Sequence, residues 1–340
     1  MSGAALRAAV ERAATILVAS EPLPDGDAFG SEVALRLMIQ QTFGLAASRA
    51  EGRAGQGPKF VQVLNERGIP ERYAFLEGAT GRAPGREDEA GYDLGILVDG
   101  GVERTGLAVR AVYERCRARA YVDHHRAGSA APYDVKIVQP TSASTTEAIF
   151  SLLDGDGWSD VKIDRPLAEA LYVGLVADTG SFMYSLTTPR THRVAARLLE
   201  AGVRTTFIAE KVLLDVKLED LELEAKVVLA LEREHGGRLL VGVLSLDMLA
   251  GRDPRLVAYD KIVTPIAFVE GTTVTLLLRE VDPRVWKLSF RSRGGVDVSK
   301  VAREIDPQGG GHERAAGCEL RGPLEDVKRV AVAAIGRALG

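Results

Sequence analysis

The chain has 340 residues, 46% hydrophobic and 26% charged, so it has the composition of an ordinary soluble protein and the length for two domains. Its formal net charge of −4 excludes a protein that binds long duplex DNA through an overall basic surplus. The absence of an apolar run of about 18 residues excludes a membrane span, and the charged start of the chain is unlike a signal peptide. We therefore expect a cytoplasmic protein with a small anionic ligand.

The first half of the chain alternates between short apolar runs and helical patterns. Three runs are typical of buried parallel strands: Thr15–Ala19, Leu94–Val98 and 118–122. Helical patterns occupy 31–40 and 165–177, and Ser144 with Glu147 three residues later predicts the start of another helix. This alternation predicts an α/β domain with a mostly parallel sheet, which we place at residues 1–190.

The second half begins with a long helical periodicity over residues 191–234. We interpret residues 191–235 as a helical linker and residues 236–340 as a smaller α/β domain. The expected strands and the last helix of this domain are 239–244, 273–278, 287–291 and Leu324–Leu339.

Acidic residues and histidines follow the predicted elements of the first domain. They are Asp25 and Asp27 after the first strand, Asp99 after the second, Asp123, His124 and His125 after the third, and Asp178 after the helix at 165–177. Groups that follow parallel strands meet at one edge of the sheet, where carboxylates this close repel each other unless a cation lies among them. Aspartate and histidine without cysteine favour Mn²⁺, or else Mg²⁺, over structural zinc. Two such ions, bridged by Asp99, could promote attack of water on a phosphate ester.

Taken singly, these residues also have ordinary structural explanations. An aspartate after a strand, such as Asp99, is most often a turn or N-cap residue, and Asp25 to Asp27 could form a plain turn. Two of the five histidines lie side by side at a strand end, which favours a metal or phosphate role.

The second domain contains a glycine-rich motif with a histidine. Backbone N–H groups of such a motif can approach an anion closely, and arginines at a strand end can contact phosphate. The candidates are Gly309, Gly310, Gly311, His312, Arg291 and Arg293. The alternative is a flexible loop beside a solvated strand end.

These motifs, in this order and over nearly the whole chain, resemble those of the DHH phosphoesterases that carry a DHHA1 domain. Asp123-His124-His125 is similar to the motif that gives the family its name, and residues 309–317 resemble the glycine-rich DHHA1 motif. The nanoRNase subgroup is the most similar. It combines hydrolysis of short oligonucleotides with phosphatase action on 3′-phosphoadenosine 5′-phosphate.

The resemblance implies a role for each matching residue. The metal ligands would be Asp25, Asp27, Asp99, His124 and Asp178. Asp99, Asp123 and His125 would act in catalysis, with His125 at the scissile phosphate and Asp123 orienting a histidine. The glycines, His312 and the two arginines would bind the substrate in a cleft between the domains.

One position departs from the family pattern, because Glu21 stands where the family has a metal-binding histidine. Glu21 could bind a metal through oxygen, or it could leave the first site weak. The alternatives to a nanoRNase-like exonuclease are therefore a catalytically weakened nucleotide-binding protein and a cyclic-dinucleotide phosphodiesterase. An inorganic pyrophosphatase is disfavoured by residues 309–317. The sequence leaves a homodimer open.

Overall fold

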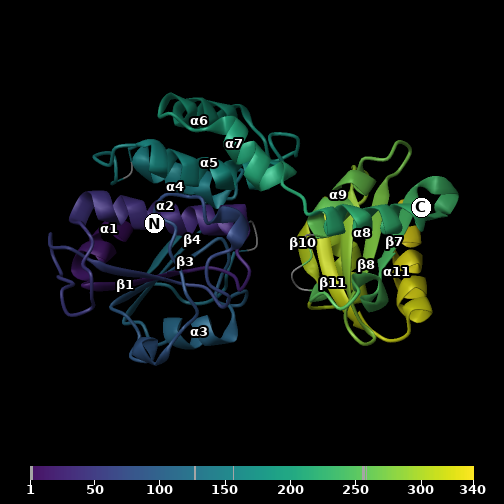
Figure 1. Cartoon of the computed structure of the whole chain (residues 1–340), viewed down its shortest axis with the longest axis horizontal. Coiled ribbons are helices and arrows are strands. Elements are labelled where there is room, and N and C mark those ends of the chain that lie inside the picture. The colour runs from purple at the N-terminus through teal and green to yellow at the C-terminus, as the bar shows by residue number, and fades with distance from the viewer. Residues whose placement is uncertain (1–2, 126–127, 156, 255–256, 258) are drawn as a thin grey trace. The chain divides into compact units, whose positions relative to one another are not determined.

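The computed structural model describes residues 3–125, 128–155, 157–254, 257 and 259–340. Contacts within the chain divide it into two units, Met1–Asp215 and Val216–Gly340 (Figure 1). Each unit has its own sheet and its own hydrophobic core, as the length of the chain led us to expect.

The first unit is built on a five-stranded parallel sheet with the order β2-β1-β3-β4-β5. The predicted central strands are confirmed as β1 (Thr15–Ala19), β3 (Leu94–Val98) and β4 (Ala118–Asp123). The two edge strands, β2 (Phe60–Leu64) and β5 (Val135–Val138), were not predicted, because their partly exposed side chains break the continuous apolar pattern.

Helices cover both faces of this sheet (Figure 1). One face packs against α1 (Gly3–Arg12), α2 (Gly26–Phe43), α4 (Thr145–Leu153) and α5 (Arg165–Thr179), and the other against α3 (Leu107–Tyr113). The backbones of α2 and α5 touch, since a Cβ on Gly30 would lie 2.5 Å from the carbonyl oxygen of Ala170. This contact holds the start of α2 and the end of α5 near the same edge of the sheet.

The stretch over 191–234 is helical for most of its length but is interrupted twice. It contains α6 (Pro189–Glu200), α7 (Thr205–Ala209), a π-helical turn at Glu210–Leu214 and α8 (Leu218–Leu229), and it ends in strand β6 (Glu232–Glu234). Gly202, with φ of 91°, turns the chain between α6 and α7. The helices before Asp215 belong to the first unit, and α8 belongs to the second.

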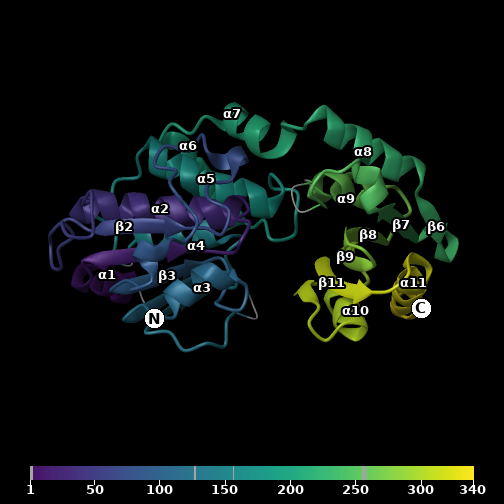
Figure 2. The same cartoon turned by 60° about the horizontal axis from the view of Figure 1, so that its bottom comes forward.

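The second unit has a six-stranded mixed sheet with the order β10-β11-β9-β8-β7-β6. Its other strands are β7 (Leu239–Leu244), β8 (Val274–Asp282), β9 (Val285–Ser292), β10 (Gly310–His312) and β11 (Ala315–Arg321). Helices α10 (Val298–Ile305) and α11 (Leu324–Leu339) cover one face, while α8 and α9 (Tyr259–Ala267) cover the other (Figure 2). The three predicted strands and the last helix are thus confirmed.

Short 3₁₀ turns complete the secondary structure at Glu71–Tyr73, Arg86–Asp88, His235–Gly237 and Leu246–Leu249. Among the described residues, every helix is too short or too polar to cross a lipid bilayer.

Candidate functional site

The strand order of the first unit creates a switch point between β1 and β3. The chain leaves β1 toward β2 on one side, while β3 and the later strands lie on the other, and ligands of open parallel sheets bind beyond the strand ends at such a point. Asp99 directly follows β3, Asp123 is the last residue of β4, and Asp27 lies in the first turn of α2 after β1. The predicted convergence of these residues is therefore present.

The Asp27 carboxylate is buried against the N-terminus of α4. It accepts hydrogen bonds from the backbone N–H groups of Thr145 at 2.6 Å and Thr146 at 2.9 Å. The helix dipole and these donors, which have no partner within the helix, stabilise a negative charge there. Neither threonine was predicted from the sequence, although the helix start was: Ser144 accepts the N–H of Glu147 at 3.0 Å, as the capping pattern predicted.

His124 faces three carboxylates. Its Nε2 atom lies 3.0 Å from Asp178 Oδ2, 3.7 Å from Asp99 Oδ1 and 4.0 Å from Asp27 Oδ2. Its Nδ1 lies 3.3 Å from the carbonyl oxygen of Ser142, which favours the tautomer that keeps the Nε2 lone pair for a ligand. Burial lowers the pKa of His124, but the hydrogen bond and charge of Asp178 and the other carboxylates outweigh it and raise this pKa to about 9.

The carboxylates of this site lack enough positive charge from the protein itself. Burial and the charge of Asp178 raise the pKa of Asp27, and burial with the charges of Asp27, Asp25 and Asp178 raises the pKa of Asp99 well above its usual value. Asp99 is also held in the left-handed region, at φ of 54°, with its Oδ1 accepting the Thr145 hydroxyl at 2.9 Å. A divalent cation would relieve the repulsion that both shifts reflect.

Two groups of side chains have ligand atoms within 4.8 Å of one another. One consists of Asp27, His124 and Asp178, and the other of Asp99, Asp123, His124 and His125. Oxygen and imidazole nitrogen without sulfur suit a divalent ion of the Mn²⁺ or Mg²⁺ type. The residues present therefore fit a metal ion centred near His124.

Asp123 holds His125 in one orientation. Its carboxylate accepts the backbone N–H groups of both histidines, the Nδ1–H of His125 at 2.7 Å and the hydroxyl of Tyr121. Burial raises the pKa of Asp123, but these bonds and the charge of His125 lower it below its usual value. With Nδ1 as the donor, Nε2 of His125 is an acceptor, and Arg104 Nη1 lies 3.3 Å from it.

Glu21 and Asp25 make other contacts. Asp25 caps α2, where its Oδ1 accepts the N–H groups of Asp27 and Ala28, and Glu21 Oε2 accepts from Arg104 Nη2 at 2.9 Å. Neither belongs to a group of converging ligand atoms within the described ranges. Arg104 was not singled out from the sequence, because nothing in its spacing from Asp99 distinguishes it from a surface arginine.

In the second unit, Arg291 and His312 lie in one row of the sheet. Ala315 of β11 pairs with Arg291 of β9 on one side and with His312 of β10 on the other, so the three side chains share a face. Arg293 lies just beyond β9 and contacts the carbonyl oxygen of Val269 at 3.2 Å.

The structure explains the three predicted glycines in different ways. A Cβ on Gly309 would lie 2.7 Å from the carbonyl oxygen of Ala302, and one on Gly311 would lie 2.5 Å from that of Ala315. Close packing within the unit therefore explains both, while Gly310 borders open space. Of the three, only Gly310 leaves its surroundings open for a ligand.

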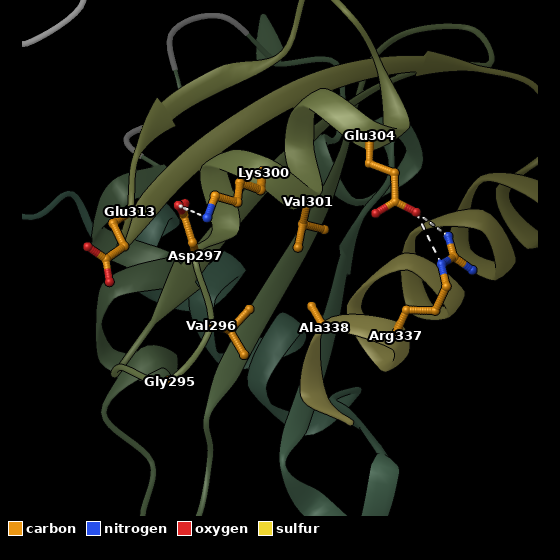
Figure 3. A pocket seen from close by; sticks show the side chains of 9 residues that line it. All are labelled: Gly295, Val296, Asp297, Lys300, Val301, Glu304, Glu313, Arg337 and Ala338. Carbon is orange, nitrogen blue, oxygen red and sulfur yellow. Dashed lines mark hydrogen bonds and ion pairs between the residues drawn. The ribbon is translucent and has the colours of Figure 1, made fainter.

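A pocket of about 630 Å³ lies beside this motif in the second unit (Figure 3). Its charged side chains pair with one another, Asp297 with Lys300 at 3.6 Å and Glu304 with Arg337 at 2.5 Å. Glu313 also lines it, but none of the six predicted substrate-binding residues does. Its paired charges give it no evident preference for an anion.

Comparison with known proteins identifies both units. Residues 15–175 match the DHH family, N-terminal domain, and residues 251–339 match the DHHA1 domain. The bifunctional oligoribonuclease and PAP phosphatase NrnA of Thermus thermophilus is 28% identical over 313 residues, which cover 90% of this chain and 84% of that protein. The protein of the same name from Bacillus subtilis is 25% identical over 90% of this chain and 89% of its own length.

A solved structure shares the fold. The exopolyphosphatase-related protein of Bacteroides fragilis superposes with a TM-score of 0.82 at 23% identity, covering 98% of this chain and 94% of that one. The two domain matches and the similarity to NrnA proteins agree with the motifs at the strand ends. The chain therefore belongs to the DHH family, as a phosphoesterase enzyme with a DHH domain followed by a DHHA1 domain.

Proposed function

We propose that this protein hydrolyses the phosphodiester bonds of short oligoribonucleotides or dinucleotides to mononucleotides, and that it removes a phosphate from 3′-phosphoadenosine 5′-phosphate. The observation that carries the proposal is the cluster of buried carboxylates around His124, at the switch point of a domain that matches the DHH family. The names of the NrnA relatives support both activities.

The cluster would bind a divalent ion through Asp27, His124 and Asp178, with Asp99 beside them. We propose Mn²⁺, with Mg²⁺ as the alternative. Such an ion supplies a Lewis acid for a phosphate oxygen and for water. The two ions that the family resemblance predicts remain a prediction, and the ligands around His124 account for one of them.

The side chains of the first unit would divide the remaining work. Asp123 holds His125 by its Nδ1, so the ring is fixed in the orientation in which we place it beside the scissile phosphate. Thr145 positions Asp99 through its hydroxyl and Asp27 through its backbone N–H, which keeps both carboxylates aimed at the ion. Burial of the cluster strengthens each of these interactions.

The second unit would bind the substrate. Arg291 and His312, on one face of the sheet, are suited to a terminal phosphate and a base, and the space beside the Gly310 Cα is open. Arg293 would add a second guanidinium at the end of β9. A cytoplasmic location, a homodimer and the exclusion of long duplex DNA also remain proposals.

A substrate panel tests the proposal and ranks its alternatives. Purified protein with Mn²⁺ is incubated with a diribonucleotide, a short RNA, a cyclic dinucleotide, 3′-phosphoadenosine 5′-phosphate and pyrophosphate, and the products are separated by chromatography. We expect turnover of the diribonucleotide and of 3′-phosphoadenosine 5′-phosphate. Preferred turnover of the cyclic dinucleotide or of pyrophosphate would contradict the proposed substrate class. No turnover with nucleotide still bound would favour the weakened binding protein, which the comparisons do not support.

A further inference from the structure

Arg104 links Glu21 to the site. It lies in the turn that follows β3, five residues after Asp99, and its Nη2 donates to Glu21 Oε2 at 2.9 Å. Its Nη1 donates to Nε2 of His125 at 3.3 Å. The Glu21 side chain is 22% exposed and the Arg104 side chain 51%, so the glutamate is the more buried partner and the arginine is half-exposed.

Glu21 differs from Asp27 and Asp178 in its source of positive charge. Asp27 and Asp178 converge on His124, where a metal ion fits. Glu21 converges instead on the guanidinium, which stays charged at every physiological pH. The Glu21 carboxylate is thus already paired with a cation, and it belongs to no group of converging ligand atoms among the described residues.

We propose that Glu21 is a positioning residue that holds Arg104 over the site, and that the Arg104 guanidinium contacts the substrate phosphate. This inference rests on the proposed function and deepens it. The described contacts use two of the five N–H donors of the guanidinium, and a planar fork of donors matches the oxygens of a phosphate. The bond to His125 Nε2 brings the guanidinium beside the ring that we place at the scissile phosphate.

Measurements of metal binding and of phosphate binding distinguish a metal-ligand role of Glu21 from the proposed positioning role. Mn²⁺ bound per chain is measured by equilibrium dialysis, and adenosine monophosphate is titrated into the Mn²⁺-loaded protein by calorimetry. We expect Glu21→Gln to keep the wild-type number of Mn²⁺ ions. We expect Arg104→Gln to weaken the binding of adenosine monophosphate by about 10- to 100-fold, which is the range for the loss of a hydrogen bond to a charged group. Arg104→Lys should recover part of this affinity, since it keeps the charge but not the fork.

Two controls keep the interpretation specific. Arg110→Gln with Glu114→Gln removes an exposed ion pair at the end of α3 and should leave both measurements unchanged. The double variant Glu21→Gln with Arg104→Gln leaves no unpaired Glu21 charge, so its loss of adenosine monophosphate affinity should match that of Arg104→Gln alone. Recovery of wild-type affinity in the double variant would overturn the proposed contact, because the loss would then come from the exposed Glu21 charge.

Other results would also overturn the inference. Loss of a bound Mn²⁺ ion in Glu21→Gln, with the wild-type number retained in Arg104→Gln, would identify Glu21 as a metal ligand. Wild-type adenosine monophosphate affinity in Arg104→Gln, or no binding to the wild type at all, would remove Arg104 from the phosphate site. Both readouts are independent of turnover. A wild type that binds adenosine monophosphate through Arg104 but hydrolyses nothing would refute the proposed function alone.

Discussion

Glu32 is a fully buried carboxyl on α2 whose ionisation should weaken the first unit. Its Oε1 accepts the hydroxyl of Ser20 at 2.7 Å and its Oε2 accepts Asn65 Nδ2 at 3.0 Å. Burial, aided by the charge of Glu21, outweighs these two bonds and raises the pKa of Glu32 to about 8. Glutamine at this position cannot ionise and keeps the shape of the side chain.

The sign of the effect follows from the raised pKa. The protonated carboxyl is favoured in the folded state, so stability is highest below the unfolded pKa of 4.5 and is lost as the pH rises toward about 8. One pKa unit corresponds to about 1.4 kcal/mol. The free energy of unfolding of the wild type should therefore fall by about 3 kcal/mol between pH 6 and pH 9 because Glu32 ionises. Glu32→Gln should remove that loss and become the more stable protein at pH 9.

Tryptophan fluorescence can follow the first unit by itself. The chain has two tryptophans, and Trp286→Phe leaves Trp158, which is buried in the first unit, as the only probe. Urea unfolding is measured at pH 6 and pH 9 in EDTA, with and without Glu32→Gln. The proteins with and without Glu32→Gln share all other titrating groups, so the effects of those groups cancel when the two are compared. If both proteins lose the same free energy of unfolding between the two pH values, the burial argument for Glu32 is refuted.

Three further substitutions test the site. Asp99→Asn should lower kcat by about 10³-fold or more with an unchanged circular dichroism spectrum, because it removes a buried carboxylate at the metal site; near-normal kcat would contradict its role. Gly174→Ala places a Cβ 2.4 Å from Thr146 Oγ1 and 2.5 Å from Asp27 Oδ1. It should therefore destabilise the first unit by about 1–3 kcal/mol and weaken Mn²⁺ binding in dialysis. If neither the stability nor the Mn²⁺ affinity changes, α5 can shift at little energetic cost. His312→Ala should raise KM by about tenfold with kcat nearly constant in steady-state assays; the reverse pattern would place His312 in the chemical step.

The parts of the fold that could be predicted from sequence are those with local signals. The central strands β1, β3 and β4 are continuous apolar runs because both of their faces are covered, and an aspartate marks the end of β3 and of β4. The edge strands β2 and β5 carry partly exposed residues, and β10 and β11 are rich in glycine and alanine, so their patterns are weak.

The site residues that could be predicted are likewise those with a local signal in the sequence. Asp27, Asp99, His124 and Asp178 were predicted because carboxylates and histidines that follow an apolar run or a helical pattern stand out in the sequence. Thr145 acts through its backbone N–H and Arg104 through contacts with residues far away in the chain, so neither has a local pattern. The pairing of Glu21 with Arg104 likewise became visible only in the structure.

Metal-dependent hydrolysis of a linear diribonucleotide tests directly whether the strand-end cluster is the hydrolytic site. The wild type and Asp99→Asn are each stripped with EDTA, reloaded with or without Mn²⁺, and mixed with the substrate, and mononucleotide is quantified over time. We predict product only from the wild type with Mn²⁺. Equal product from the stripped wild type, or from the Mn²⁺-loaded Asp99→Asn variant, would contradict the assignment of the strand-end cluster as the hydrolytic site.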